Sequence, residues 1–165
     1  MSGGAQVIID NLDYLLWGRA GSGEPGGVLL TLLMALGAAA VALPAGILLA
    51  CVAWRYSGVV RRILFLWADL IRGIPLIFVI FWLWYLLPLM TGHDLPGAMT
   101  VTLALAWFTA ASVMHTVLAG IHALPKGQTE AALSQGLDSF SLLWNVILPQ
   151  GLRNVIPSLV GILIN

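Results

Sequence analysis

An uncharged run, residues 28–54, limits the fold more than any other feature of the sequence. At about 1.5 Å of rise per helical residue, a run of this length crosses the ~30 Å hydrocarbon core of a bilayer. The chain has 165 residues, of which 60% are hydrophobic and only 8% are charged. A soluble domain of this size needs a larger charged surface, so the sequence predicts an all-α, polytopic membrane helix bundle.

Two further runs are long and apolar enough to span a membrane. Residues 63–90 carry Asp69 and Arg72 near their start, and residues 97–124 have His115 and His122 as their only ionisable groups. A fourth apolar stretch, residues 154–165, makes only about 18 Å of helix and is too short to cross. The sequence therefore predicts three full spans and a partial fourth, and we expect the natural protein to continue beyond this point.

The positions of the basic residues predict the orientation of these spans. Arg55, Arg61 and Arg62 lie between the first two runs, whereas the next turn, TGHDLPG, has no Lys or Arg. Lys126 and Arg153 lie in or near the polar segment that follows the third run. Since basic loops remain cytoplasmic, the N-terminus is expected outside and residues 125–150 are expected in the cytoplasm.

Residues 1–27 are expected to form an external N-terminal segment. The stretch VIIDNLDYLLWG has apolar residues on one helix face, and its Tyr14 and Trp17 suit a membrane interface. We therefore expect a helix lying on the bilayer surface. A disordered leader is the alternative, because chain termini often lack fixed structure.

Composition also excludes several classes of function. The net charge is zero, so a nucleic-acid-binding protein, which needs a basic face, is not expected. The single cysteine, Cys51, lies in an apolar run and is expected to act as a small packing residue. His93 and His122 have no Cys or carboxylate at ligand spacing, so no metal is predicted, and no other cofactor is implied.

Residues 125–150, the polar segment, begin with a predicted short helix. Pro125 has no N–H to continue the preceding helix and is expected to end it. Gln128 or Thr129 can then start a helix of strong helix formers, TEAALSQ. Gly136 is placed to stop this helix in the left-handed conformation.

A second short helix is predicted to follow within the same segment. Asp138 or Ser139 can cap its start, and Pro149 is expected to end it. No nucleophile–base pair or phosphate-binding glycine loop is present in the segment. The residues alone therefore leave two interpretations open, a rigid docking element for a partner or an ordinary amphipathic connector.

The amino-acid sequence of this segment favours the interpretation as a docking element. GQTEAALSQGLDSFSLLWNVILP resembles the EAA motif of ATP-binding-cassette importer permeases, which reads E-A-A, three residues, G, nine residues, I, any residue, L, P. Val146 in place of Ile is the only departure. The resemblance implies that this segment forms the coupling helix that sits in a groove of a cytoplasmic ATPase. The implied coupling residues are Gln128, Glu130, Ala131, Ala132, Gly136, Val146, Leu148 and Pro149.

A second stretch points to a subfamily. ADLIRGIPLIFVIFWLWYLLP, residues 68–88, is similar to the Arg-Gly-Thr-Pro stretch of polar amino acid permeases of the histidine/glutamine/glutamate type, with Ile74 for Thr. That family implies a type I importer fold of five spans, with the coupling loop between the third and fourth. It also implies a bacterial inner-membrane location, two ATPase subunits, a second permease subunit, identical or similar, and a periplasmic amino acid-binding protein.

Polar residues inside the predicted spans are candidate functional residues. Asp69 and Arg72 are three residues apart on one helix face and can pair near the cytoplasmic interface. Together with Gly73 and Pro75 they are candidates for a gate or interface region. Pro75 would bend its helix, which suits either gating or plain packing.

The third run contains a candidate substrate pathway. His115 lies mid-span, where a polar group marks a functional site unless it is a neutral, hydrogen-bonded packing residue. The subfamily usually reads Ala-Glu-x-x-Arg-Gly-Gly here, and this chain has His115 for Glu and Leu118 for Arg. Thr109, Ser112 and His115 are the predicted pathway residues. In the first run, Ala38, Ala42 and Gly46 recur at four-residue steps and predict close helix packing.

The sequence as a whole predicts a non-enzymatic permease subunit of an ATP-driven amino acid importer that works by alternating access. Two other classes remain open. An ion-driven secondary transporter would need coupling carboxylates at mid-membrane, for which Asp69 is the only candidate. A membrane scaffold or assembly protein without transport activity is the other alternative.

Overall fold

A computed structural model describes residues 3–19 and 24–164 of the chain. Residues 1–2 and 20–23 of the predicted N-terminal segment, and Asn165 at the end of the predicted fourth run, lie outside the described residues. The elements are α1 (Gly3–Asp10), α2 (Leu12–Trp17), β1 (Gly18–Arg19), β2 (Glu24–Pro25), α3 (Gly27–Arg55), α4 (Val59–Gly73), α5 (Leu76–Thr91), α6 (Gly97–His122), α7 (Lys126–Ser134), α8 (Ser139–Leu142), the π-helix η2 (Leu143–Ile147) and α9 (Leu148–Ile164).

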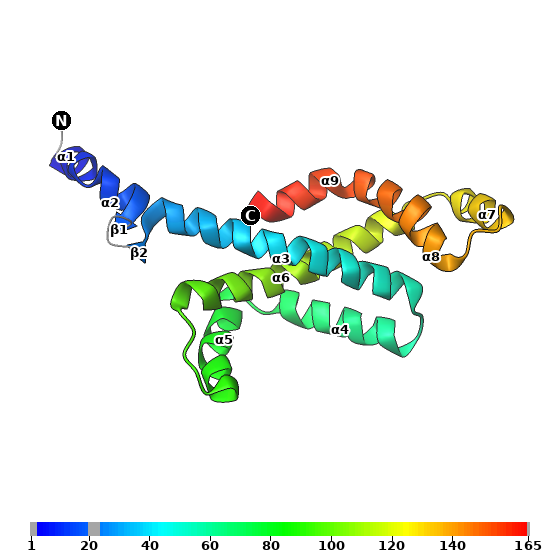
Figure 1. Cartoon of the computed structure of the whole chain (residues 1–165), viewed down its shortest axis with the longest axis horizontal. Helices are drawn as coiled ribbons and strands as arrows, with labels where there is room; N and C mark the ends of the chain where they lie inside the picture. Colours follow the sequence, from blue (N-terminus) through cyan, green and yellow to red (C-terminus); the bar gives the residue numbers. More distant parts are fainter. Residues whose placement is uncertain (1–2, 20–23, 165) are drawn as a thin grey trace.

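The long helices form one bundle with α6 at its centre. Helices α3, α4 and α9 all contact α6, and α5 contacts it from the side (Figure 1). Helix α5 runs across the direction of the other helices, and α7 projects from one end of the bundle (Figure 1). The fold is the predicted all-α bundle, with one small addition: β1 and β2 pair as two antiparallel strands of two residues each.

Within residues 3–19 and 24–164, three helical stretches are long and apolar enough to cross a membrane. They are α3, α6 and the continuous stretch Ser139–Ile164, which joins α8, η2 and α9. The bent pair α4 and α5 can supply a fourth span. Residues 154–164 of the predicted partial span are the last part of a longer described helical stretch, which begins at Ser139 and reaches 26 residues.

The longer stretch includes Pro149, which was predicted to end the second helix of the polar segment. The helix instead continues through Pro149, because η2 comes directly before it. The N–H of Leu148 donates to the carbonyl of Leu143, five residues back, as in a π-helix. Such a widened turn is a known way for a helix to accommodate an irregularity, here a residue that has no N–H to donate.

The second predicted span, residues 63–90, is broken rather than kinked. Helix α4 ends at Gly73, α5 begins at Leu76, and their axes differ by 105°. Ile74 is extended, with φ −102° and ψ 135°, because a residue before proline is disfavoured in the helical region. Pro75 then caps the start of α5 with φ −56° and ψ 135°. Pro75 therefore separates two helices, where the sequence predicted one bent helix.

Small residues allow the helices of the bundle to approach closely. The predicted positions Ala38, Ala42 and Gly46 are all buried on α3, as is Cys51. A Cβ atom on Gly46 would lie 2.6 Å from the Cβ of Val113 on α6. This packing confirms the prediction made from the four-residue steps.

The interface of α6 with α9 is equally close. A Cβ atom on Gly120 would lie 2.5 Å from Cγ1 of Val155 and 2.6 Å from the carbonyl oxygen of Gly151. A Cβ atom on Gly151 would in turn lie 3.2 Å from the backbone of Ile121. The two helices therefore meet backbone to backbone at this crossing.

The N-terminal segment is helical where it is described. Helices α1 and α2 cover most of the predicted stretch, and their large apolar residues, including Ile8, Tyr14 and Trp17, are exposed. The predicted helix is therefore confirmed in its secondary structure. Its position on a bilayer surface stays a prediction.

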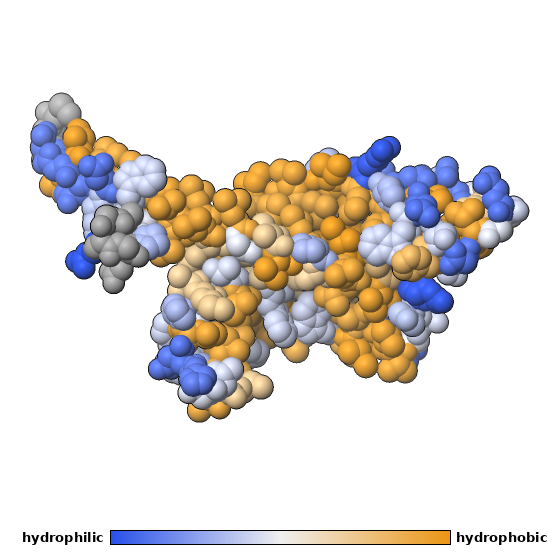
Figure 2. Space-filling model, in the orientation of Figure 1, coloured by the Kyte–Doolittle hydropathy of each residue, from blue (hydrophilic) through white to orange (hydrophobic). Residues whose placement is uncertain are grey.

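The polar surface is concentrated away from the middle of the bundle. Figure 2 shows an apolar central surface, with hydrophilic residues at the end that carries α7 and on the N-terminal segment. The turn between α3 and α4 lies at the same end as α7 (Figure 1). The structure thus places Arg55 and Lys126 at one end of the bundle, as the predicted topology requires.

The crossing of α6 and α9 gives a stability test. Gly120→Ala adds a methyl group where the backbone carbonyl of Gly151 leaves no room, so we expect a loss of about 1–3 kcal/mol. The matched variant Gly161→Ala, on α9, meets nothing within 4 Å and should be neutral or slightly stabilising. Thermal unfolding of the purified protein in detergent compares the two. Equal midpoints for both variants would contradict the close crossing.

Candidate functional site

Helix α7 begins earlier than the sequence predicted. It starts at Lys126, with Pro125 as the N-cap residue, and not at Gln128 or Thr129. The backbone of Pro125 is extended (φ −58°, ψ 136°), and its carbonyl accepts the N–H of Gln128 at 3.0 Å. A proline suits this position because the first N–H groups of a helix have no partner within the helix.

The end of α7 is a Schellman motif built on Gly136. Gly136 has φ +81°, as predicted for a left-handed cap, and its N–H donates to the carbonyl of Leu133 at 2.9 Å. The N–H of Leu137 donates to the carbonyl of Ala132 at 3.2 Å. These two bonds satisfy carbonyls that the helix end would otherwise leave without a partner. The short helix therefore has a fixed end.

The next helix is capped two residues later. Asp138 has an extended backbone, and its carboxylate accepts the N–H of Phe140 at 3.1 Å. Hydrogen bonds from the Ser141 side chain and then from the Phe140 N–H lower the pKa of Asp138 below its ordinary value of 3.8. The cap is therefore intact at neutral pH and is lost only as the pH falls through that lowered value.

The coupling residues implied by the EAA motif, here called the EAA-type residues, divide into an exposed set and a buried set. Glu130, Ala131, Gly136 and Pro149 are exposed. Ala132 and Leu148 are buried, and Val146 is half-buried against the core. Alternating roles of this kind allow the segment to anchor itself to the bundle while it presents a surface outward.

Helix α7 offers most of its surface to solvent. Ala132 is its single buried residue, and the helix lies at the extreme end of the bundle (Figure 1). One long-range hydrogen bond ties it to α9: Nε2 of Gln150 donates to Oε1 of Gln128 at 3.5 Å. The helix is therefore fixed at both ends and open along its length.

Two of the predicted pathway residues line a cavity of about 300 Å³. Thr109 and Ser112 on α6 face it, together with apolar residues from the start of α5 and the end of α9, namely Leu76, Leu105, Phe108 and Ile162. His115, the third predicted pathway residue, is not part of its lining. The structure thus brings Thr109 and Ser112 together at one cavity, and His115 lies outside its lining.

His115 meets a residue that the sequence had assigned to a different group. Its Nε2 lies 3.2 Å from Oδ1 of Asp69 on α4. The sequence spacing allowed Asp69 to pair with Arg72, but in the described chain it is His115 from the neighbouring helix that lies beside the carboxylate. The exposed residues Arg72, Gly73 and Pro75 lie at the break between α4 and α5.

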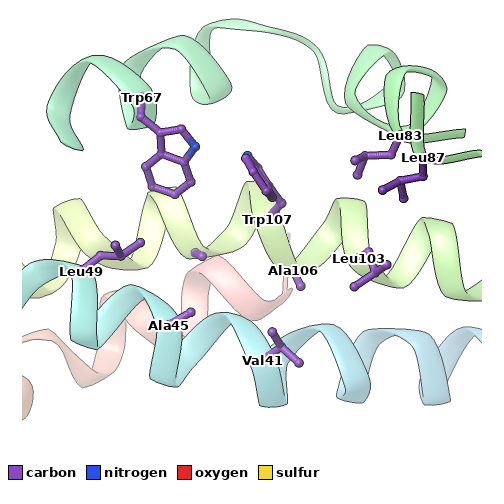
Figure 3. A pocket seen from close by; sticks show the side chains of 10 residues that line it. Val41, Ala45, Leu49, Trp67, Leu83, Leu87, Leu103, Ala106 and Trp107 are labelled. Atoms are coloured by element: carbon purple, nitrogen blue, oxygen red, sulfur yellow. The ribbon is translucent and has the colours of Figure 1, made fainter. Parts of the chain in front are cut away.

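An apolar cavity of about 430 Å³ lies where α5 turns away from α4. Trp67 and Trp107 point toward one another across it, with ring centroids 6.0 Å apart (Figure 3). Leu83 and Leu87 from α5 and Val41, Ala45 and Leu49 from α3 complete most of its wall (Figure 3). With no charged side chain in its lining, this cavity is a poor place for a charged solute.

Three features of the site were missed by sequence reasoning. The hydrogen bond between Gln128 and Gln150 had no signal, because it joins residues 22 positions apart. The π-helix before Pro149 had none either, since five ordinary apolar and polar residues form it. The contact of Asp69 with His115 could have been suspected only from the scarcity of ionisable groups in the two spans.

Comparison with known proteins places the chain among membrane transport components. The model of the family described as "Binding-protein-dependent transport system inner membrane component" matches residues 42–165. The chain is 40% identical over 141 residues to the inner membrane amino-acid ABC transporter permease protein YhdY of Escherichia coli. It is 36% identical over 144 residues to the glutamate/glutamine/aspartate/asparagine transport system permease protein BztC of Rhodobacter capsulatus.

The coverage of these matches is unequal. They include 84% and 85% of this chain but 38% and 33% of the two relatives. A solved structure described as "Crystal structure of an amino acid ABC transporter with histidines" is similar with a TM-score of 0.70 and 28% identity. That match covers 84% of this chain and 64% of the other. The fold is accordingly that of a type I importer transmembrane domain.

Substitutions at Gly136 and at Gly127 test whether the Gly136 turn fixes the C-terminal end of α7. Gly136→Ala meets nothing within 4 Å, but its positive φ costs about 1–2 kcal/mol for a residue with a Cβ. Gly127→Ala, inside α7 and also without neighbours, should stabilise the helix instead. Hydrogen exchange of residues 126–134 should accelerate in the first variant and slow in the second. The same exchange rate in both would mean that Gly136 does not fix the helix.

Proposed function

This chain belongs to the family of binding-protein-dependent transport system inner membrane components, and we propose that it is a permease subunit of an ATP-driven amino acid importer. The family match covers three quarters of the chain, and the similar proteins YhdY and BztC are named as amino acid permeases. In this proposal the chain is a transport component and not an enzyme. ATP hydrolysis belongs to a separate cytoplasmic subunit.

One observation supports the proposal most directly: the EAA-type residues form a capped helix that projects from one end of the bundle. Helix α7 exposes Glu130 and Ala131, and its C-terminal end is held by the Gly136 turn. A projecting helix with small side chains allows a partner's backbone to approach closely. We therefore assign α7 the role of the coupling helix that docks on an ATPase.

The connection from α7 to the membrane span supports a mechanical role. Two residues, Leu137 and Asp138, follow the Gly136 turn before the continuous stretch Ser139–Ile164 begins. This stretch packs against α6 at the Gly120–Gly151 crossing. A displacement of α7 would therefore be passed through a short, capped turn to a helix in the wall of the bundle, and a connector that frayed would lose it.

In the proposed cycle, ATP binding closes a pair of ATPase subunits and pulls the coupling helices together. The spans then rock so that the pathway opens outward, and hydrolysis returns them to the inward arrangement. A second permease subunit, identical or similar, forms the other half of the pathway. An external amino acid-binding protein delivers the solute, with the N-terminus of this chain on the same, outer side of the membrane.

A pull-down tests the coupling role. Glu130→Lys reverses the exposed charge on α7, and Gly136→Pro replaces the residue of the left-handed cap with one whose φ is fixed near −65°. Each variant should retain at most about a tenth of the bound ATPase subunit, which corresponds to ~1.4 kcal/mol of binding free energy. Gly127→Ala, in the same helix, should bind as the unchanged protein does.

Uptake of radiolabelled amino acids into proteoliposomes separates this proposal from the two other classes. An importer requires internal ATP and the ATPase subunit. Uptake that continues without the ATPase and stops with an ionophore would indicate an ion-driven transporter. A chain that binds partners but supports no uptake would be a scaffold. Either result would overturn the proposal.

A further inference from the structure

Helix α4 keeps its charged residues on one side. At about 100° per residue, the four charged positions Arg61, Arg62, Asp69 and Arg72 fall within a sector of roughly 100°. The exposed apolar residues Ile63, Leu66 and Leu70 of α4 occupy the neighbouring sector. The apolar sector suits lipid. The charged sector requires water or protein.

The carboxylate of Asp69 lies well inside this arrangement. Asp69 is ten residues after Val59, where α4 begins, which is roughly 15 Å along the helix. Its side chain is 63% exposed in the described chain. Because an exposed carboxylate at that depth is unfavourable against hydrocarbon, the seam between α4 and α6 must face water or protein at Asp69.

The contact of Asp69 with His115 leaves hydrogen-bonding capacity unused. The Nε2 atom of His115 is 3.2 Å from Oδ1 of Asp69, but it is buried and has no hydrogen-bond partner among the described residues. The short distance is therefore an electrostatic approach without an aligned hydrogen bond. Both groups can accept a better-aligned partner without breaking an existing hydrogen bond.

Neighbouring groups hold the imidazole at this position. The ring of Phe65 packs edge-on against His115, with centroids 5.0 Å apart and planes at 85°. The guanidinium of Arg61 lies 5.4 Å from the centroid of the same Phe65 ring. His115 is consequently fixed by α4 on one side, while Asp69 remains accessible.

The same side of α6 carries the hydroxyl residues of the smaller cavity. Thr109, Ser112 and His115 fall within roughly 120° of one another around α6. Thr109 and Ser112 line the cavity of about 300 Å³ next to Leu76, the first residue of α5. A stripe of polar groups therefore leads from this cavity to the pair of Asp69 and His115.

On the basis of the proposed function, we propose that Asp69 and His115 form a gate between α4 and α6 that a zwitterionic amino acid opens by replacing their contact. The ammonium group of the solute binds the Asp69 carboxylate, and the solute carboxylate accepts the N–H of His115 Nε2. Each gate residue then has one group of the solute as its partner, so neither Asp69 nor His115 is left unpaired when the two side chains move apart. The gate closes again when the solute leaves.

A metal bridge tests the gate. In a Cys51→Ala background, Asp69→Cys places a thiolate beside His115, and Zn²⁺ binds thiolate and imidazole at about 2.3 and 2.0 Å. Micromolar Zn²⁺ should reduce ATP-driven uptake of the amino acid at least tenfold, and a chelator should restore it. The Cys51→Ala protein and a variant that adds His115→Ala should be unaffected by Zn²⁺. Full uptake with Zn²⁺ bound would overturn the gate.

A binding measurement covers the case in which the Asp69→Cys variant is inactive without metal. Zn²⁺ held by the thiolate and His115 blocks the Nε2 atom that the solute carboxylate needs, so saturating solute should raise the apparent Kd for Zn²⁺ at least tenfold, with Kd expressed as free Zn²⁺ because amino acids chelate the metal. Independent binding of the two would overturn the gate. ATPase pull-down on each variant and uptake by the unchanged protein test the importer function separately. If the unchanged protein transports but Zn²⁺ and the amino acid do not compete, only the gate proposal is overturned.

Discussion

The arrangement of the whole bundle depends on how closely the backbones of its central helices approach. Helix α6 meets α3 at Gly46 and α9 at Gly120 and Gly151, where a Cβ atom on the glycine would clash with the neighbouring helix. In a membrane there is no hydrophobic effect between helices, so close contact and packing must supply the attraction. These crossings fix α9 against α6, and α9 in turn fixes the position of the polar segment that follows α6.

That segment gains its rigidity from three local devices in sequence. The turn at Gly136 satisfies the end of α7, Asp138 caps the next helix, and η2 carries this helix through Pro149. Between the projecting helix and the bundle there is consequently little chain that can bend freely. A transport subunit that is moved by a separate ATPase needs this property, because flexible connections absorb displacement.

The sequence predicted the fold class, the small-residue packing and the Gly136 cap, since each depends on a local pattern. It could not predict what happened at two of the three prolines to which it assigned a role. Pro75 breaks a span into α4 and α5, and Pro149 lies within a continuous helix. The outcome at each was decided by the backbone beside it: an extended Ile74 in one place and a π-helix in the other. The π-helix has no sequence pattern of its own, and the preference of a residue before proline for extended backbone does not by itself distinguish a break from a kink.

Contacts between distant segments were also beyond local reasoning. Asp69 was expected to pair with Arg72 three residues away, but the bundle places His115 from α6 beside it. Likewise, Thr109 and Ser112 share a cavity that exists only because α5 and α9 both reach α6. Spacing along one helix identified which residues are polar at depth. It could not identify their partners.

The central claim is that α7 lies on the cytoplasmic side of the membrane, where an ATPase can reach it. Gln135, exposed at the end of α7 and outside the EAA-type residues, is a suitable position for a label. In a Cys51→Ala background, Gln135→Cys should react with a membrane-impermeant maleimide in inverted membrane vesicles and remain unreacted in intact spheroplasts. Reaction in intact spheroplasts would place α7 outside the cell and contradict the account.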